Sequence, residues 1–381
     1  MTISQEMLLH TEKLHQEALQ IVRDLCKIPA PSHHEEQRAE YCRKWFTENG
    51  FTDVKIDEAL NVLAPLNFSL GGSEPFTVMM AHTDTVFPDL EPMPFTEKDG
   101  VMYCPGVTDD TANLAVLMVC AKYYKDHLPA SPEKILFVAN SCEEGLGNLK
   151  GSRKIMADYG KRVTAFVSLD CACMDRIVTR AVGSHRYKVR VTTEGGHSFG
   201  SFGNRNAIQC LASLINFLYT VKVPKEGNST TTYNVGLISG GTSVNTIAQN
   251  AEMLYEYRSD SRECLAKMQN LFQHAIEAFR ATGISVEVEL LGERPCGSAV
   301  PQEAFDALKN RYFSSLRDVL HTEGQERSGS TDSNIPLSMG IPAICFGVCR
   351  GAGAHTREEK LETESLLDGC KLFLDFLYRG K

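Results

Sequence analysis

The chain has 381 residues, more than one hydrophobic core usually supports, so two domains are expected. Its formal net charge of -9 at pH 7 argues against nucleic acid or an anionic membrane as a partner. The composition, 43% hydrophobic and 23% charged, is that of an ordinary globular protein, and no apolar run approaches the roughly 20 residues of a membrane span.

The first part of the chain alternates helical and strand-like patterns. Helices are predicted at 7–26, 35–49, 111–126 and 151–159. Strands are predicted at 54–56, 61–66, 76–81, 134–140 and 165–169, the last three as continuous apolar runs typical of buried strands. Strands that alternate with helices form a mostly parallel sheet flanked by helices, so the fold class is α/β.

The pattern changes near residue 181. Residues 186–193 alternate with the period of two of a half-exposed strand. Further strands are predicted at 230–238, 253–258 and 285–291, and helices at 206–219 and 262–282. The block 181–292 is therefore expected to be an inserted α+β sandwich within a catalytic domain formed by 1–180 and 293–381.

After Pro295 the α/β pattern returns. A helix at 302–320, a strand at 343–346 and a helix at 364–378 are predicted. The stretch 322–333 is rich in Ser, Gly and Thr and is expected to be a loop, in which Asp332 would cap a following helix.

Cysteine usage indicates the redox compartment. The 13 cysteines follow no regular framework, and several lie in apolar runs such as 343–346. Cys171 and Cys173 have no second pair at zinc-finger spacing. Reduced thiols and a cytoplasmic location are expected.

Polar side chains gather where the buried strands end. His82 and Asp84 follow 76–81, Glu143 and Glu144 follow 134–140, and Asp170 follows 165–169. Asp109 precedes a predicted helix, and His355 follows a strand and a Gly-rich loop. Ligands bind at the carboxyl ends of strands in such sheets, so one cleft is expected to hold these groups.

Each of these residues also has an ordinary explanation. An isolated His is usually a satisfied polar residue, an Asp such as Asp110 can cap a helix, and an acidic pair is usually solvated. Their coincidence at several strand ends favours a site. Two imidazoles with three carboxylates suit Zn²⁺, with Mn²⁺ or Co²⁺ as possible substitutes.

In order and spacing, several segments together resemble the M20 co-catalytic zinc hydrolases, which include carboxypeptidase G2-like and peptidase T-like enzymes and acetylornithine and succinyl-diaminopimelate deacylases. The resemblance covers nearly the whole chain. The segments are Ile28-Pro29-Ala-Pro-Ser, Ala-His82-Thr-Asp84, Gly106-Val-Thr-Asp109-Asp110, Glu143-Glu144, Asp170, Gly-Gly-His197-Ser and Ala-His355-Thr. It implies amide-bond hydrolysis by a water held between two divalent metal ions, with Zn²⁺ as the expected metal.

The resemblance also implies residue roles. His82 and Asp170 would hold one ion, Glu144 and His355 the other, and Asp109 would bridge them. A cis peptide would join Asp109 to Asp110. Glu143 would be the general base, and Asp84 would orient the His82 ring.

The inserted domain carries implied roles as well. His197 would reach a neighbouring active site and polarise the scissile carbonyl, acting in trans in a homodimer formed through this domain. Asn245 and Arg258 would hold a substrate carboxylate. An ion pair on the strand face is an equally open explanation of Arg258.

The predicted activity is that of an M20-type metallopeptidase acting on a short peptide or N-acyl amino acid with a free carboxylate. Asp170 favours a peptidase, since several deacylases of the family have Glu there. An N-acyl amino acid deacylase is the alternative. Two departures from the family pattern are present: Ala81 is a small change, and Thr111-Ala112 weakens the transfer of fine specificity.

An NAD-dependent oxidoreductase is a remote alternative. Gly145-Leu-Gly147 after a buried strand imitates a dinucleotide-binding turn, with the acid Asp170 further on. Gly151 falls one residue too late for the third glycine, and Glu143 and Glu144 would repel a pyrophosphate.

Overall fold

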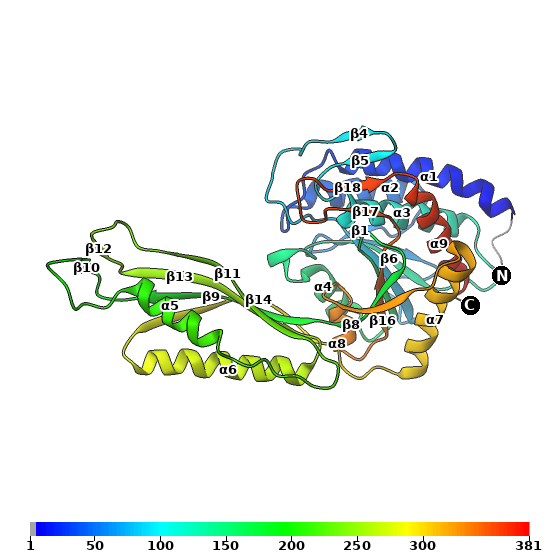
Figure 1. The fold of residues 1–381 in the computed structure, drawn as a ribbon. Coiled ribbons are helices and arrows are strands. Elements are labelled where there is room, and N and C mark those ends of the chain that lie inside the picture. Colours follow the sequence, from blue (N-terminus) through cyan, green and yellow to red (C-terminus); the bar gives the residue numbers. More distant parts are fainter. Residues whose placement is uncertain (1–4, 381) are drawn as a thin grey trace. The chain divides into compact units, whose positions relative to one another are not determined.

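The structure, a computed structural model, describes residues 5–380. Contacts divide the chain into two units: unit 1 runs up to Arg180 and resumes at Ser298, and unit 2 is Ala181–Gly297. Each is described by itself (Figure 1). None of the helices in the described part of the chain has the length and apolar character needed to cross a membrane.

Unit 1 is built on an eight-stranded mixed sheet of order β1-β2-β6-β3-β7-β16-β8-β15. Its four central strands, β6, β3, β7 and β16, are parallel to one another. Every residue of β3, β6 and β16 is buried, as expected for strands covered on both faces. The strands are β1 (Lys55–Ile56), β2 (Val62–Leu66), β3 (Phe76–His82), β6 (Ile135–Asn140), β7 (Val163–Leu169), β8 (Arg176–Ala181), β15 (Gln325–Gly329) and β16 (Ala343–Phe346).

Seven helices surround this sheet in the described part of unit 1. They are α1 (Gln5–Leu25), α2 (Glu36–Glu48), α3 (Ala112–Asp126), α4 (Lys150–Tyr159), α7 (Gln302–Leu320), α8 (Asn334–Ser338) and α9 (Ser365–Tyr378). Helix α3 is apolar on nearly every side and packs between α1, α9 and strand β3. The α/β class predicted from the sequence is confirmed.

Several short strands were not predicted. β4 (Thr96–Lys98), β5 (Val101–Tyr103), β17 (Gly351–Ala352) and β18 (Lys360–Glu362) form a separate four-stranded sheet in unit 1. The prediction of a loop over 322–333 was wrong, because β15 lies within it and ends the main sheet. Its charged, Gly-ended sequence suits an exposed edge and gives no apolar signal.

Unit 2 has a four-stranded antiparallel sheet of order β11-β13-β9-β14 with two helices packed on it (Figure 1). Its elements are β9 (Gly183–Thr192), β10 (Gly196–His197), α5 (Ala207–Leu218), β11 (Thr231–Gly240), β12 (Thr246–Ile247), β13 (Asn250–Ser259), α6 (Arg262–Ala281) and β14 (Ser285–Arg294). Each helix begins at a capping side chain: Asn206 accepts N–H groups of α5, and Ser261 accepts one of α6. A two-stranded ribbon, β10 with β12, extends from this sheet.

Candidate metal centre

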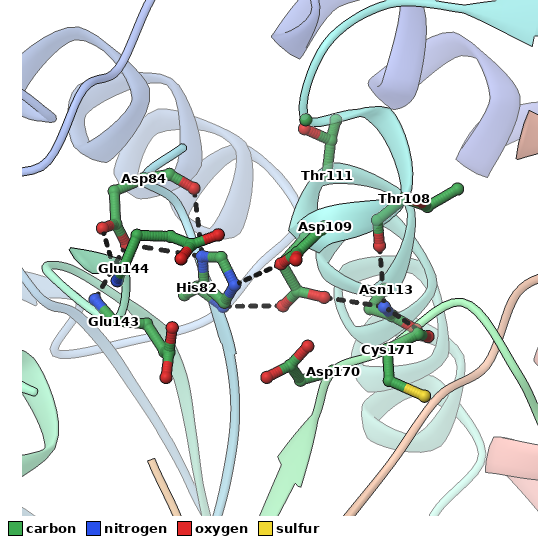
Figure 2. Close-up of polar contacts among 12 residues, drawn as sticks. His82, Asp84, Thr108, Asp109, Thr111, Asn113, Glu143, Glu144, Asp170 and Cys171 are labelled. Atoms are coloured by element: carbon green, nitrogen blue, oxygen red, sulfur yellow. Dashed lines mark hydrogen bonds and ion pairs between the residues drawn. The ribbon is translucent and has the colours of Figure 1, made fainter. Parts of the chain in front are cut away.

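His82 is the last residue of β3 and is buried at the carboxyl end of the parallel strands. Its Nδ1–H donates to the carbonyl oxygen of Asp84 at 3.0 Å, and its Nε2 lies 3.0 Å from Oδ1 of Asp109. A ring whose Nδ1 donates to an oxygen is fixed in the tautomer that leaves Nε2 available to a cation. Figure 2 shows this ring between Asp84 and Asp109.

Asp109 lies between two imidazoles. It projects from the irregular turn Val107–Thr111 that leads into α3, and its peptide bond to Asp110 is cis. Oδ1 of Asp109 faces His82, and Oδ2 lies 3.0 Å from Nε2 of His355. The same nitrogen of His355 lies 3.0 Å from Oε1 of Glu144. One carboxylate therefore joins the two histidines.

Three groups of side chains in the described chain have donor atoms close enough to share a cation. They are His82 with Asp109 and Asp170, Asp109 with Glu144 and His355, and His82 with Glu143 and Glu144. Within each group the donor atoms lie within 4.8 Å of one another. The first two groups share Asp109, which is the pairing that the resemblance implies for two ions. Figure 2 shows Asp109, Glu144 and Asp170 converging near His82.

Negative charge exceeds positive charge at this site. Two imidazoles face six carboxylates: Asp84, Asp109, Asp110, Glu143, Glu144 and Asp170. Burying carboxylates without cations is costly. Imidazole nitrogens with carboxylate oxygens are the donors that zinc and similar divalent ions take, so the residues present fit a metal centre.

The pKa values follow from this crowding. Burial and repulsion from Asp109 raise the pKa of Asp170, and burial raises that of Glu144. Hydrogen bonds to Asp109 and Glu144 raise the pKa of His355 to about 11. Burial opposes charge on His82, but the carboxylates of Asp110 and Asp109 outweigh it and raise its pKa.

Asp84 contacts both the His82 ring and the backbone of the acidic pair Glu143 and Glu144. Its Oδ1 lies 3.3 Å from Nδ1 of His82, and its two oxygens accept the backbone N–H groups of Glu143 at 3.0 Å and Glu144 at 2.9 Å. The hydroxyl of Ser32 donates to it at 2.6 Å. Asp84 therefore links the His82 ring to the backbone of the acidic pair.

Glu359 holds the turn that carries Asp109. This buried carboxylate accepts the N–H groups of Gly106 at 2.7 Å, Thr108 at 2.7 Å and Asp109 at 3.0 Å, and the hydroxyl of Thr108 at 2.6 Å. Glu359 lies shortly after His355 in the chain. One segment therefore supplies both the imidazole that faces Asp109 and the carboxylate that holds the turn carrying Asp109. No sequence pattern marks Glu359, since its partners are mostly backbone groups far away in the chain.

Asp110, for which capping was the ordinary explanation, and Asp332, which was expected to cap a helix, have other partners. Asp110 accepts the N–H of His82 at 2.8 Å and the amide of Asn113 at 2.7 Å, whereas α3 has no side-chain cap. Asp332 accepts the amide of Asn140 at 2.6 Å and does not cap α8, which also has no side-chain cap. Burial and the charge of Glu143 raise the pKa of Asp332 to about 7. The capping prediction for Asp332 was wrong, and the capping explanation considered for Asp110 does not hold, because both side chains are buried beside the strand ends.

In unit 2, the structure brings His197 and Asn245 together on the β10–β12 ribbon. His197 pairs with Thr246 in that ribbon, and the N–H of Ser198 donates to the carbonyl of Asn245 at 2.9 Å. Nδ1 of the exposed His197 accepts the N–H groups of Phe199 and Gly200, both at 3.3 Å. In the neutral ring the proton is then on Nε2, which is free to act as a donor.

Arg258 lies apart from this ribbon, on β13. Its Nε and Nη2 donate to the two oxygens of Glu256 at 2.8 and 3.0 Å, a bidentate ion pair along one strand face. This is the second of the two explanations that the sequence left open for Arg258. A substrate carboxylate would have to compete with Glu256 for it.

Comparison with known sequences gives a family. The model of the family described as Peptidase family M20/M25/M40 matches residues 78–379. A succinyl-diaminopimelate desuccinylase from Corynebacterium glutamicum is 27% identical over 373 residues, which cover 94% of this chain and 95% of that protein.

Solved structures have the same fold. The dipeptidase Dug1p from Saccharomyces cerevisiae superposes with a TM-score of 0.78 at 16% identity, covering 98% of this chain and 97% of that one. The aminopeptidase PepT from Bacillus cereus gives a TM-score of 0.72 at 20% identity, with 96% and 98% covered. At these identities the likeness concerns the fold.

Proposed function

The chain belongs to the peptidase family M20/M25/M40, and on that premise we propose that it hydrolyses the amide bond of a short peptide or N-acyl amino acid bearing a free carboxylate. The observation that carries this proposal is the shared carboxylate of Asp109, 3.0 Å from His82 on one side and 3.0 Å from His355 on the other. Glu143 lies in the same cluster but is not one of the five proposed ligands, so its carboxylate is assigned another role.

The cofactor is proposed to be a pair of divalent ions, with Zn²⁺ first and Mn²⁺ or Co²⁺ as substitutes. His82, Asp109 and Asp170 would hold one ion, and Asp109, Glu144 and His355 the other, in the groups described above. When bound, such ions supply Lewis-acid polarisation and lower the pKa of water toward about 7.

Glu143 is assigned the proton transfers. Its carboxylate takes a proton from the attacking water as the water oxygen bonds to the amide carbon. As the carbon–nitrogen bond breaks, the same group gives the proton to the leaving nitrogen. The products are an amine and a carboxylic acid, and the acid loses the second water proton to solvent at neutral pH. The backbone N–H of Glu143 is held by Asp84, which fixes where its side chain projects.

His197, Asn245 and Arg258 are assigned to substrate contacts. An Nε2–H donor on His197 suits an oxyanion on the former carbonyl. Asn245, beside it on the ribbon, is proposed for the substrate carboxylate. Arg258 is proposed for the substrate carboxylate, in exchange for Glu256, because its two donors are already arranged for a bidentate carboxylate.

A deacylase is the second candidate function. The 27% identity to a succinyl-diaminopimelate desuccinylase over 94% of the chain favours it, whereas Asp170 favours a peptidase. Removal of an acyl group from an amino acid is also hydrolysis of an amide bond, and it would use the same proposed metal ligands and Glu143. The two differ in what lies on the acyl side of the amide.

A homodimer through unit 2 is proposed, in which His197 acts in the partner's site. β11 is an edge strand, so its outer backbone groups can pair with a second copy. Leu237 and Ile238 on this strand are 47% and 52% exposed, and Phe199 and Phe202 near the ribbon are 87% and 91% exposed. All 13 cysteines are free, which supports a reducing compartment such as the cytoplasm.

A substrate panel tests the function. Di- and tripeptides would be compared with N-acetyl and N-succinyl amino acids, each with a free and an amidated carboxyl end, on protein loaded with Zn²⁺. Cleavage of the free-carboxylate peptides supports a peptidase, and cleavage of the acyl amino acids alone supports the deacylase. No cleavage of any member would contradict both.

Arg258→Ala tests the carboxylate contact within this panel. It should raise KM for the free-carboxylate substrates and leave KM for their amides unchanged. An equal rise for both would contradict the assignment of Arg258.

A further inference from the structure

Three consecutive backbone N–H groups next to the proposed base donate to buried carboxylates. The N–H of Glu143 donates to Asp84 at 3.0 Å and that of Glu144 to the same side chain at 2.9 Å. The N–H of Cys142 donates to Oε1 of Glu35 at 3.0 Å. The acidic segment 142–144 is thus held by two side chains, and the family resemblance gave a role to Asp84 alone.

The backbone of this segment needs external support. Cys142 has a φ of 57°, in the left-handed region that L side chains rarely adopt. It lies beyond the end of β6, and no strand in the described part of the chain pairs with it. A Cβ at Gly147 would lie 2.7 Å from the Cα and the carbonyl oxygen of Cys142, so the chain folds back closely on this residue. Small movements at Cys142 would therefore displace Glu143.

The burial of Glu35 is not explained by a capping role in the helix that follows it. Glu35 precedes α2, yet its side chain makes no capping hydrogen bond to that helix. It is fully buried, and Oε1 also accepts the N–H of His33 at 3.1 Å and the S–H of Cys142 at 3.2 Å. Its Oε2 has no hydrogen-bond partner among residues 5–380. A buried acid is costly to keep without a cation. Within the part of the chain that the structure describes, the only long-range hydrogen bonds of the Glu35 side chain are with Cys142.

We propose that Glu35 is a positioning residue for Glu143. By accepting the N–H of Cys142, it fixes the backbone from which the Glu143 carboxylate projects, and so sets the rate of proton transfer. The inference rests on the proposed function of Glu143 as the base. Glu35 acts on the base without bonding to a proposed ligand, unlike Asp84, which contacts both His82 and Glu144.

The hydrogen bond and the charge of Glu35 can be separated by substitution. Glu35→Ala removes the acceptor for Cys142. Glu35→Gln keeps a carbonyl oxygen at the Oε1 position for both N–H groups and replaces the unpartnered Oε2 with an amide. Glu35→Asp keeps the carboxylate but withdraws it by one methylene, and serves as the second variant if the alanine variant does not fold.

A matched control lies at the other end of the same strand. Glu133 is mostly buried, two residues before β6, and accepts the hydroxyl of Thr77 at 2.6 Å. Glu133→Ala therefore removes a carboxylate from the amino end of β6, whereas Glu35→Ala removes one that supports its carboxyl end. The control should lower thermal stability and leave kcat unchanged.

Three measurements would be made on the full chain loaded with Zn²⁺. They are kcat and KM on the best panel substrate, Zn²⁺ affinity by chelator competition, and amide hydrogen exchange over 141–147. Glu35→Ala should lower kcat by about tenfold to a hundredfold, the cost of a small misplacement of a reacting group. KM and Zn²⁺ affinity should stay near wild type, and exchange over 141–147 should accelerate. Glu35→Gln should have a kcat and an exchange rate over 141–147 close to those of the wild type. The values for Glu35→Asp should lie between those of the wild type and Glu35→Ala.

The opposite results are equally defined. Wild-type kcat in Glu35→Ala, or a loss in Glu35→Gln as large as in Glu35→Ala, would overturn the positioning role. Equal losses of kcat and Zn²⁺ affinity would also overturn it, because Glu35 would then act on the ligands. Failure of the wild-type protein on the whole panel would contradict the proposed function instead, and the exchange data would still show whether Glu35 holds segment 142–144.

Discussion

Nε2 of His355 lies 3.0 Å from Oδ2 of Asp109, and the other oxygen of that carboxylate is equally close to His82. These residues come from distant parts of the chain. They meet because β3 ends at His82 and the turn carrying Asp109 is tied by Glu359 to the segment that carries His355. The shared carboxylate places two groups of donors side by side, which is the geometric basis of the proposed two-ion centre.

Glu143→Gln should abolish turnover and leave metal binding intact. The amide keeps the size of the side chain but takes up no proton, and loss of a general base costs about 10²- to 10⁴-fold in rate. The measurement is kcat alongside the Zn²⁺ content of the purified variant. Full activity in this variant would remove Glu143 from the mechanism.

Zn²⁺ affinity should increase with pH between about 6 and 8. The pKa of His355 is raised to about 11 by Asp109 and Glu144, so without a cation this ring is protonated at neutral pH. A bound cation must displace that proton, and the competition weakens as pH rises. Chelator competition at several pH values measures the slope, which should be shallower in His355→Gln. A slope that is flat in the wild type would contradict the proton displacement.

The same shift has a consequence for the metal-free protein. A raised pKa in the folded state means that the ion pair of His355 contributes stability fully below the ordinary His pKa of about 6.5. That contribution is lost as pH rises toward about 11. The Tm of metal-free protein should therefore fall as pH rises from about 6.5 toward about 11. His355→Gln should remove this part of the pH dependence.

Glu359→Ala should weaken metal binding by about 10- to 100-fold, the usual cost of losing a support behind a ligand. The side chain accepts four hydrogen bonds from the turn that carries Asp109. The neighbouring Glu358 is exposed, so Glu358→Ala is the matched control and should keep wild-type affinity. Equal affinities in the two variants would show that the turn holds Asp109 without Glu359.

Mixed dimers test whether His197 acts in the partner's site. Glu143→Gln and His197→Ala subunits, each inactive alone, would be co-expressed with different tags and purified as the heterodimer. If His197 acts in trans, one site of the heterodimer has both an intact Glu143 and an intact His197, and activity returns. Absence of activity in a verified heterodimer would place His197 in its own subunit's site or outside the reaction.

Much of the fold was predictable because the buried strands have a strong sequence signal. The apolar runs at 76–81, 134–140 and 343–346 correspond to β3, β6 and β16, and only a buried strand or helix uses such runs. The polar residues that follow those runs therefore pointed to one edge of the sheet. The short strand β4 was missed because its three residues are all exposed and carry no periodic pattern.

The supports of the site were not predictable in the same way. Glu35 and Glu359 each bind backbone N–H groups of a distant segment, and backbone partners leave no residue type to recognise. Asp110 and Asp332 look like helix caps in sequence, since an acid before a helix has that role most often. Arg258 gave two equal explanations, because the sequence did not show that Glu256 would face it on the same strand.

The most direct test of the two-ion centre is a Zn²⁺ titration of metal-free protein, with hydrolysis of the best panel substrate followed at each point. Two ions should bind per chain, and activity should rise as they bind. Asp109→Asn should weaken the binding of both ions, because it removes the carboxylate that the two ligand groups share. A chain that binds no Zn²⁺ and hydrolyses its substrate at full rate in the presence of chelator would contradict the account.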